Sequence, residues 1–342
     1  MVTIPNTVPL MHKDIIFLPG VEESNRQMVL NFVKDWISSD EWITVQTSGS
    51  TGKPKKIQLL KSKMKASARA TIDFFKLQKN QTLLLALSTD YIAGKMMVIR
   101  ALEQNMTIVI APLQANPLLI DLPIKIHFSA FVPMQVQTIL ANNKSKANYQ
   151  NIDTVIIGGG RINEKLDAQI QTLKNDNYAT FGMTETISHI ALRNISKKEK
   201  SFTALPFVSF RSDTNNCLII HAPKVCDYQL KTNDCIELLN NNQFIWKGRY
   251  DFVINSGGIK LHPESIEKNI LSLIPNHRFY ITGENDALLG EKVVLKIESK
   301  VDFNVDELES KLSQNLTKFE QPKMIYIVHQ FKETETGKII RE

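Results

Sequence analysis

The chain has 342 residues, of which 43% are hydrophobic and 22% are charged, and its formal net charge at pH 7 is +6. This composition is that of an ordinary globular protein, and the length favours two domains over one. No apolar run approaches the ~20 residues that span a bilayer and no signal-peptide pattern is present, so we expect a cytoplasmic protein without a membrane partner.

The positive charge permits nucleic-acid binding, but the lysines are scattered and no basic stripe with interleaved aromatic residues is present. We therefore expect no nucleic-acid partner. A mildly basic surface equally attracts anionic small molecules. Cys217, Cys226 and Cys235 are too evenly spread for a CxxC-type metal site, and we expect them to be reduced structural thiols.

Short apolar runs alternate with helical periodicity over the first part of the chain. Residues 1–22 are dotted with prolines and are expected to be irregular, whereas residues 23–38 carry apolar side chains at helical spacing. Further helices are expected at residues 61–75, 93–104, 134–142 and 163–173. Strands are expected at residues 42–46, 82–87, 107–111, 126–132, 153–158 and 178–181. This alternation predicts an α/β fold with a parallel-rich sheet flanked by helices.

The pattern changes near residue 202. Short predicted strands at residues 217–221, 235–239 and 243–246 surround asparagine-rich turns, which predicts a small antiparallel region. Beyond it, helices are expected at residues 263–273 and 306–316, and strands at residues 293–297 and 324–328. We therefore predict a large domain over residues 1–250 and a small α+β domain over residues 251–342.

A glycine-rich loop follows the predicted strand at residues 42–46 and reads Thr-Ser-Gly-Ser-Thr-Gly-Lys-Pro-Lys-Lys. Its glycines permit backbone angles that expose N–H groups, and its hydroxyls and lysines add donors and positive charge, which suits a polyphosphate. The spacing is not that of a Walker A loop. Taken alone, the loop can equally be a solvated turn. The candidate phosphate-binding residues are Thr47, Ser48, Gly49, Ser50, Thr51, Gly52 and Lys53.

Two more motifs lie where predicted strands end. Residues 178–185 read Tyr-Ala-Thr-Phe-Gly-Met-Thr-Glu, which places Thr184 and Glu185 where open α/β sheets bind ligands. A helix N-cap followed by a first-turn acid is the alternative interpretation. Three glycines at residues 158–160 would let a flat ring approach the backbone, although a strand-to-helix turn also uses glycines.

These motifs resemble those of the adenylate-forming superfamily of acyl- and aryl-CoA synthetases and adenylation domains, and they follow one another along the chain in the same order as in that superfamily. The loop resembles the superfamily's phosphate loop, and residues 181–185 resemble its Y/F-G-M-T-E motif. The resemblance implies that Thr184 contacts the α-phosphate of ATP and that Glu185 holds Mg²⁺, a hard cation that prefers oxygen ligands. The resemblance also includes the three glycines at residues 158–160. Together with residues 181–185, it implies that Gly158, Gly159, Gly160, Phe181, Gly182 and Met183 bind the nucleotide.

The resemblance continues toward the C-terminus. It implies that Asp234 takes the ribose hydroxyls, although Asn233 replaces the glycine that usually precedes this carboxylate. The Gly-Arg-Tyr-Asp tetrad resembles the hinge motif of the superfamily, which implies a ribose or phosphate contact for Arg249 and a pivot between domains at Asp251. The adjoining residues 256–264 imply a CoA path. Its expected members are Gly257, Gly258 and Lys260.

A last motif, at residues 334–341, reads Thr-Glu-Thr-Gly-Lys-Ile-Ile-Arg. Taken alone it is a polar turn near a chain end. The resemblance implies that Lys338 is catalytic and contacts both the acid's carboxylate and the α-phosphate. A lysine fits this role because a mobile point charge can neutralise the charge that builds up on both oxygens.

In the sequence of residues 181–188 and in its compact length, the chain most resembles the ligases that activate o-succinylbenzoate in menaquinone synthesis. This implies that Ser188 and His189 face the acyl pocket. Tyr91 replaces the usual histidine and either gates the site or packs, and Lys95 either pairs with a second carboxylate or is solvated. Because the phosphate loop begins already at Thr47, we expect the first N-terminal subdomain to be largely missing.

We therefore expect an acid–CoA ligase that uses ATP, Mg²⁺ and CoA and works in two half-reactions. The alternatives are a ligase for another carboxylic acid, an adenylating enzyme that does not use CoA, and a truncated nucleotide-binding homologue without activity. The intact Lys338 and Glu185 argue against the last. The acid, and the choice between a monomer and a homodimer, stay open.

Overall fold

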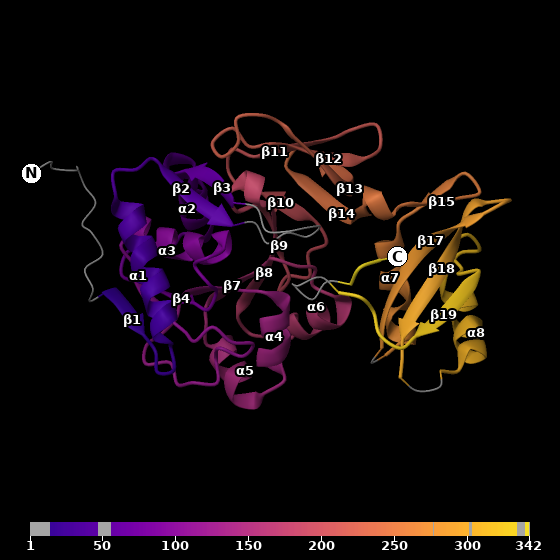
Figure 1. Ribbon diagram of the computed structural model, residues 1–342, viewed down its shortest axis with the longest axis horizontal. Helices are drawn as coiled ribbons and strands as arrows, with labels where there is room; N and C mark the ends of the chain where they lie inside the picture. The colour runs from indigo at the N-terminus through magenta and orange to yellow at the C-terminus, as the bar shows by residue number, and fades with distance from the viewer. Residues whose placement is uncertain (1–13, 47–55, 276, 301–302, 334–338, 342) are drawn as a thin grey trace, which may run out of the picture. The chain divides into compact units, whose positions relative to one another are not determined.

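The computed structural model describes residues 14–46, 56–275, 277–300, 303–333 and 339–341 (Figure 1). The chain forms two compact units. The first takes in the described residues up to Phe210 together with Ile220–Leu230, and the second takes in Arg211–Ile219 and the described residues from Lys231 onward. The predicted domain boundary at residue 250 stays a prediction.

A twisted, parallel-rich sheet forms the centre of the first unit. Its strands follow the order β1-β5-β4-β6-β7-β8-β9-β10, and the pairs from β1 to β8 are parallel, whereas β8–β9 and β9–β10 are antiparallel. The central strands are apolar and fully buried, as expected for strands covered on both faces. The strands are β1 (Ile15–Phe17), β4 (Thr82–Leu85), β5 (Thr107–Ile110), β6 (Phe128–Phe131), β7 (Thr154–Ile157), β8 (Asp176–Gly182), β9 (His189–Asn194) and β10 (Phe202–Ala204).

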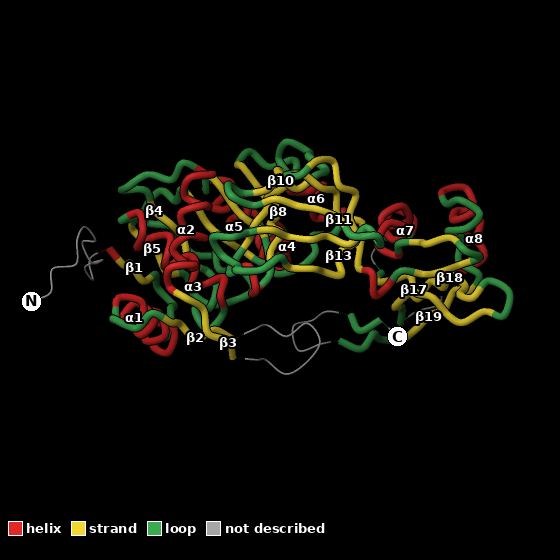
Figure 2. The backbone as a smooth tube through the Cα atoms, turned by 90° about the horizontal axis from the view of Figure 1, so that it is seen from above, coloured by secondary structure: helices red, strands yellow, loops and turns green. Residues whose placement is uncertain are grey.

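Helices pack around this sheet (Figures 1 and 2). In α1, Val29, Phe32 and Trp36 recur at helical spacing and are buried, so this helix presents one apolar face to α3. Helix α3 in turn packs against β4, β5 and β6, and α2 packs against α3. The helices are α1 (Glu23–Ile37), α2 (Lys61–Phe75), α3 (Ile92–Gln104), α4 (Pro133–Leu140), α5 (Asn143–Gln150) and α6 (Glu164–Ile170).

The expectation that residues 1–22 are irregular is wrong for one short segment. Ile15–Phe17 forms β1, which pairs in parallel with β5 through Ile15↔Ile108 and Phe17↔Ile110. Three residues carry too little periodicity to predict a strand. The pairing partner lies far along the chain, so tertiary contacts decide the conformation.

The second unit contains an antiparallel pair and a separate α+β body. Strand β13 (Leu230–Asn240) pairs antiparallel with β14 (Gln243–Arg249). In the α+β body a sheet runs in the order β16-β15-β18-β17, and β19 adds to β18 in parallel. Residues of α8 such as Leu308 and Leu312 share its core with strand residues such as Ile281 and Leu295. The elements are β15 (Ile254–Ser256), β16 (Ile259–Leu261), α7 (Pro263–Ile270), β17 (Arg278–Asp286), β18 (Gly290–Glu298), α8 (Val305–Asn315) and β19 (Met324–Val328).

The strands β11 (Ser209–Ser212) and β12 (Cys217–His221) span the sequence boundaries between the units, and so does β13 with its first residue, Leu230. The predicted α/β class, with a parallel-rich sheet, a small antiparallel region and an α+β C-terminal part, is confirmed. The three cysteines are free and buried, as expected. Within the described part of the chain, every helix is too short or too polar to cross a membrane.

Candidate active site

The predicted phosphate loop lies outside the described residues, and so does Lys338. Thr47, Ser48, Gly49, Ser50, Thr51, Gly52 and Lys53 therefore stay predictions. The strands on either side of the loop are described. β2 (Trp42–Gln46) and β3 (Lys56–Leu60) form an antiparallel pair in which Gln46 lies opposite Lys56. The two ends of the loop are thus held side by side.

The two motifs after β7 and β8 lie at the same edge of the sheet. β7 and β8 are parallel neighbours, with Ile157 opposite Ala179, and the Thr180 hydroxyl donates to the Ile157 carbonyl at 3.3 Å. The glycines that follow β7 and the Phe-Gly-Met-Thr-Glu segment that ends β8 therefore leave the sheet next to each other. Gly159 has φ +79°, a conformation that a side chain would disfavour. The structure thus brings together Gly158, Gly159, Gly160, Phe181, Gly182, Met183, Thr184 and Glu185.

A tight double turn links β8 to β9. Thr184–Thr186 forms one turn of 3₁₀ helix, and Ile187 follows with φ 67° and ψ −57° while the Ser188 N–H donates to the Thr186 carbonyl at 2.7 Å. This is a γ-turn with a positive φ, which is a strained conformation for a β-branched residue. Gly182 is required beside it, because a Cβ there would lie 2.4 Å from the Ser188 carbonyl oxygen. Backbone strain of this kind concentrates at functional sites.

Thr186 holds the double turn together. Its fully buried hydroxyl accepts from the Met183 N–H at 3.0 Å and lies within 3.0 Å of the Met183 carbonyl and 2.9 Å of the Ser188 carbonyl. Thr186→Val keeps the shape of the side chain but leaves the Met183 N–H without its acceptor. We expect a loss of about 1–3 kcal/mol in the free energy of unfolding, measured by urea denaturation. Thr138→Val on α4, where the hydroxyl bonds only to the Met134 carbonyl of its own helix, is the matched control; equal losses would contradict the role of Thr186.

A buried arginine lies beside the end of this turn. The Arg100 side chain on α3 is 1% exposed, its Nη2 donates to the Ser188 hydroxyl at 3.1 Å, and its Nη1 has only the Met97 sulfur at 3.6 Å. Among the described residues, its Nε has no hydrogen-bond partner. Burial lowers the pKa of Arg100 to about 9, and in the described part of the chain no carboxylate forms an ion pair with it. Within the described residues, this buried guanidinium therefore lacks an anion that would offset its desolvation.

Both predicted acyl-pocket residues lie near this arginine: Ser188 contacts it directly, and His189 contacts Ser188. Ser188 is half-buried, and its hydroxyl lies 3.4 Å from Nδ1 of His189. His189 is buried, and its Nε2 lies 3.1 Å from the Thr71 hydroxyl on α2. Burial, with the nearby Arg100 charge, holds the pKa of His189 well below its ordinary value, so the imidazole is neutral.

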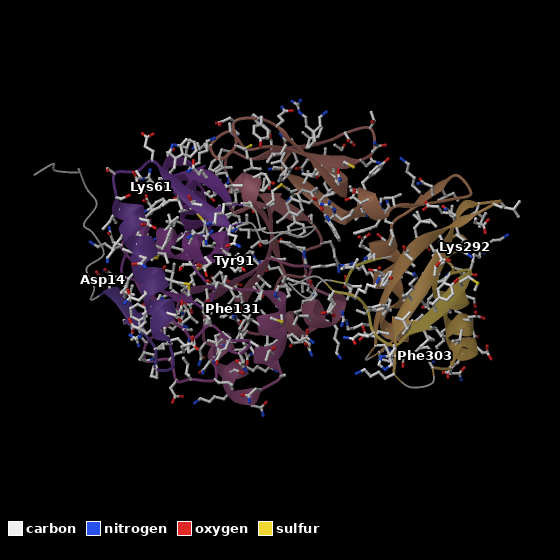
Figure 3. The ribbon with its side chains drawn as sticks, viewed as in Figure 1. Asp14, Lys61, Tyr91, Phe131, Lys292 and Phe303 are labelled. Atoms are coloured by element: carbon white, nitrogen blue, oxygen red, sulfur yellow. The ribbon has the colours of Figure 1, made fainter. Side chains whose placement is uncertain are left out.

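The sequence prediction did not include Arg100. The one available signal is a basic residue in the apolar run Met-Met-Val-Ile-Arg-Ala of α3. Lys95, the cation predicted on this helix, has its ammonium 4.6 Å from the ring centre of Phe32, and burial lowers its pKa. Tyr91, labelled in Figure 3, precedes α3, forms a parallel bridge with Gln46, and is 44% exposed.

In the second unit, Arg249 joins two predicted carboxylates. Asp234 lies opposite Arg249 across β13 and β14, accepts from the Trp246 indole at 2.8 Å, and has its other oxygen 3.8 Å from Arg249 Nη1. Arg249 Nη2 also contacts Asp251 at 2.8 Å. Burial raises the pKa of Asp234, while the Trp246 and Arg249 contacts oppose that shift. Asn233, the departure from the superfamily pattern, donates to the second oxygen of Asp251 at 2.9 Å.

The residues predicted to line a CoA path lie in the hairpin formed by β15 and β16. Gly257 and Gly258 form its turn with φ +59° and +81°, and the Gly257 N–H donates to the Leu289 carbonyl at 2.8 Å. Two positive φ angles in a two-residue turn are typical of a type I′ hairpin. Lys260 on β16 has its ammonium 5.6 Å from the ring centre of Tyr250.

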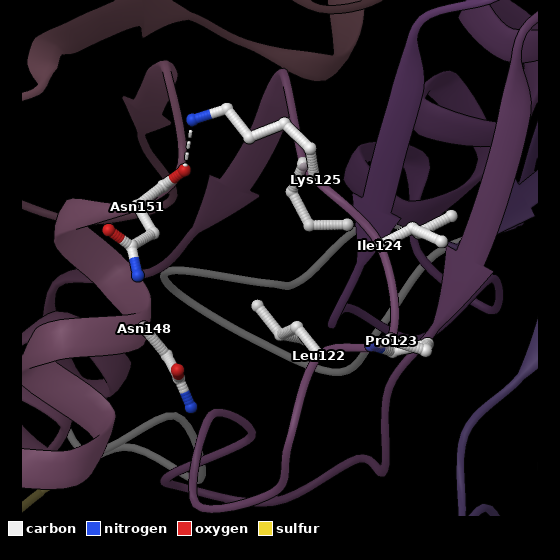
Figure 4. Close-up of a pocket in the computed structure, with 7 residues that line it drawn as sticks. Leu122, Pro123, Ile124, Lys125, Asn148 and Asn151 are labelled. Atoms are coloured by element: carbon white, nitrogen blue, oxygen red, sulfur yellow. Dashed lines mark hydrogen bonds between the residues drawn. The ribbon is translucent and has the colours of Figure 1, made fainter.

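A surface pocket of about 390 Å³ lies elsewhere in the first unit, between residues 122–126 and α5 (Figure 4). Its polar side chains bond to the protein: Lys125 contacts Asp153 and the Asn151 carbonyl, and Asn148 donates to two loop carbonyls. None of the predicted site residues lines it. Among the described residues, no group of three or more histidine, cysteine or acidic side chains could hold a metal ion by itself.

The chain is similar to several known proteins. The family described as AMP-binding enzyme matches residues 13–208. The 2-succinylbenzoate–CoA ligase of Lactococcus lactis subsp. lactis (strain IL1403) is 25% identical over 327 residues, which are 89% of this chain and 71% of the relative.

Two solved structures extend the comparison. An acyl-CoA synthetase (AMP-forming)/AMP-acid ligase II-like protein from Dyadobacter fermentans DSM 18053 is 32% identical, with a TM-score of 0.66 and coverage of 94% of both chains. The o-succinylbenzoate coenzyme A synthetase of Bacillus subtilis, in complex with ATP and magnesium ion, has a TM-score of 0.73 at 20% identity, and covers 86% of this chain and 68% of that one. At that identity, the second similarity concerns the fold.

Proposed function

The chain belongs to the AMP-binding enzyme family, and from this premise we propose that it is an ATP-dependent acid–CoA ligase whose acid carries a second carboxylate. The family resemblance predicted from the sequence is confirmed. We propose o-succinylbenzoate as the acid, a substrate that the name of the Lactococcus lactis relative also contains. The observation that supports a dicarboxylate is the buried guanidinium of Arg100, which donates to Ser188 but has no carboxylate partner among the described residues.

Arg100 favours a dicarboxylate for an electrostatic reason. Burying a guanidinium without an anion costs several kcal/mol, and the protein supplies no carboxylate among its described residues to offset this. Activation of an acid consumes one carboxylate, so a monoacid would leave Arg100 unpaired. A dicarboxylate keeps one charged group, and a guanidinium binds a carboxylate through paired N–H donors. An acid without that group would be bound more weakly.

The proposed reaction has two halves. In the first, an oxygen of the reacting carboxylate attacks the α-phosphorus of ATP and pyrophosphate leaves, which yields an acyl-adenylate. In the second, the CoA thiol loses its proton and its sulfur attacks the acyl carbonyl carbon, and AMP leaves. Thr184 would donate to the α-phosphate, and Lys338 would neutralise the charge on the attacking and phosphate oxygens.

The residues present suit Mg²⁺ bound together with ATP. Glu185, the middle residue of the 3₁₀ turn Thr184–Thr186, is exposed, and Thr184 beside it is half-buried. Mg²⁺ in nucleotide sites takes one or two carboxylates plus phosphate oxygens, so a single protein carboxylate is sufficient. When bound, the ion would reduce the negative charge of the phosphates.

For the second half-reaction we propose a hinge at Asp251, with residues 1–250 as the large domain and residues 251–342 as the small one. Asp251 lies in a short 3₁₀ turn, Tyr250–Phe252, and its carboxylate is held by Arg249 and Asn233. These side-chain bonds are exposed and each is worth little, so they permit exchange between two arrangements. We further propose that Gly257, Gly258 and Lys260 line the path of CoA.

One screen separates the alternatives. Pyrophosphate release is measured with o-succinylbenzoate, benzoate, a medium-chain fatty acid and acetate, with and without CoA. We expect the highest kcat/KM for o-succinylbenzoate and formation of a CoA thioester. A higher value for benzoate or the fatty acid would contradict the dicarboxylate. Release without thioester formation would identify an enzyme that does not use CoA, and no release with any acid would favour a non-catalytic nucleotide-binding protein.

A further inference from the structure

A chain of polar side chains runs from Arg100 into the core of the first unit. Arg100 contacts Ser188, Ser188 contacts Nδ1 of His189, and Nε2 of His189 contacts Thr71. The Thr71 hydroxyl also lies 3.3 Å from the Ser67 carbonyl, one turn earlier in α2. Thr71 is 0% exposed, so water does not compete for these bonds.

The directions of these bonds follow from the number of protons. If the Thr71 hydroxyl donates to the Ser67 carbonyl, its oxygen accepts from His189 Nε2–H. A neutral imidazole then has a lone pair on Nδ1, which accepts from the Ser188 hydroxyl. The Ser188 oxygen is left to accept from Arg100. In this arrangement the Thr71, His189 and Ser188 protons and the Nη2–H of Arg100 that points to Ser188 each have one acceptor.

The opposite direction satisfies fewer groups. If Thr71 donated to Nε2, then Nδ1–H would donate to Ser188. The Ser188 oxygen would receive two N–H groups, one of them from a cation, and its own proton would have no acceptor among the contacts described. The positive charge of Arg100 also favours a lone pair, rather than a proton, on the nearer nitrogen of His189.

We propose that Thr71 and His189 are positioning residues for the second carboxylate of the acid. They fix the Ser188 hydroxyl so that it holds Nη2 of Arg100 and leaves the Nε–H for the substrate. The identity of the ligand rests on the proposed function, whereas the direction of the hydrogen bonds from Thr71 to Arg100 does not depend on that function. Ser188 thereby acts on the acid through Arg100.

The kinetic test uses two pairs of variants. Thr71→Val removes the hydroxyl that accepts from the Nε2–H of His189, whereas Thr71→Ser keeps a hydroxyl at that position. His189→Asn places an amide near the position of Nδ1, and His189→Gln places one near that of Nε2, at a similar loss of ring volume. The readout is the ratio of kcat/KM for o-succinylbenzoate to that for benzoate, together with the melting temperature of each variant.

We expect Thr71→Val and His189→Gln to lower this ratio about tenfold, through KM of the dicarboxylate, because one neutral hydrogen bond is lost. We expect Thr71→Ser and His189→Asn to keep most of it, because an acceptor for Ser188 remains. Equal losses in His189→Asn and His189→Gln, or an unchanged ratio in Thr71→Val, would overturn the proposal in favour of simple packing.

A second measurement does not depend on turnover. In a ¹⁵N-histidine-labelled chain, with His189 assigned by His189→Asn, we expect the Nε2–H tautomer without titration across the range in which an ordinary histidine titrates. An Nδ1–H tautomer would overturn the proposal whatever acid the enzyme uses. An enzyme that prefers benzoate but shows the Nε2–H tautomer would instead contradict the proposed substrate. It would still support the proposed direction of the hydrogen bonds from Thr71 to Arg100.

Discussion

Lys338→Ala is expected to lower the rate of adenylation by 10²–10³, because it removes a charge aimed at oxygens that become more negative in the transition state. Thioester formation from a supplied acyl-adenylate should be largely retained, since the α-phosphate is already esterified in that half-reaction. The measurement is pyrophosphate release for the first half and CoA consumption for the second. Equal loss of both would contradict a role confined to adenylation.

The described residues on both sides of Lys338 are bonded within the second unit. Glu333 bridges to Ile339, and the Ile340 N–H donates to the Lys332 carbonyl at 2.9 Å. Arg341 then binds both oxygens of Glu267, at 2.7 and 3.0 Å. The matched control is Lys318→Ala, which removes an exposed lysine of the same unit. A comparable effect in both variants would indicate a general effect of charge.

The helices were predictable because their buried residues are periodic, and the central strands because their residues are apolar without interruption. In α1 the buried Val29, Phe32 and Trp36 are the residues that the helical spacing selects, and in β4 four consecutive apolar residues indicate a strand covered on both faces. β1 and β9 were not predicted. β1 has three residues, and β9 begins at His189, directly after a turn that local preferences disfavour.

The site was predictable where it depends on short motifs and not where it depends on tertiary contacts. Gly182 ends β8 and Glu185 follows it closely in sequence, so their place at the sheet edge could be inferred. The positive φ of Ile187 opposes the intrinsic preference of a β-branched residue. Only the hydrogen bonds of the surrounding turn select this conformation. Arginines are mostly exposed, so composition gives no reason to expect Arg100 to be buried.

Arg100→Met is expected to reduce kcat/KM for o-succinylbenzoate by about 10², because a charge-assisted hydrogen bond to the second carboxylate is lost. The variant should nevertheless be at least as stable as the wild type. Replacing a buried charge by an apolar side chain of similar length is often neutral or stabilising by about 1–4 kcal/mol. The free energy of unfolding from urea denaturation and the kinetics on o-succinylbenzoate and benzoate test both statements.

The combination of the two results is what distinguishes a substrate-binding cation from a structural one. If Arg100 served only to stabilise the fold, Arg100→Met would lower the free energy of unfolding, and activity on both acids would fall together. Arg100→Lys should recover only part of the preference, because an ammonium keeps the charge but not the planar pair of donors. Arg69→Met is the control, since Arg69 is an exposed cation on α2 that pairs with Glu103. A stable Arg100→Met variant with an unchanged preference for o-succinylbenzoate would refute the assignment, and Lys95→Met would then test the other cation of α3.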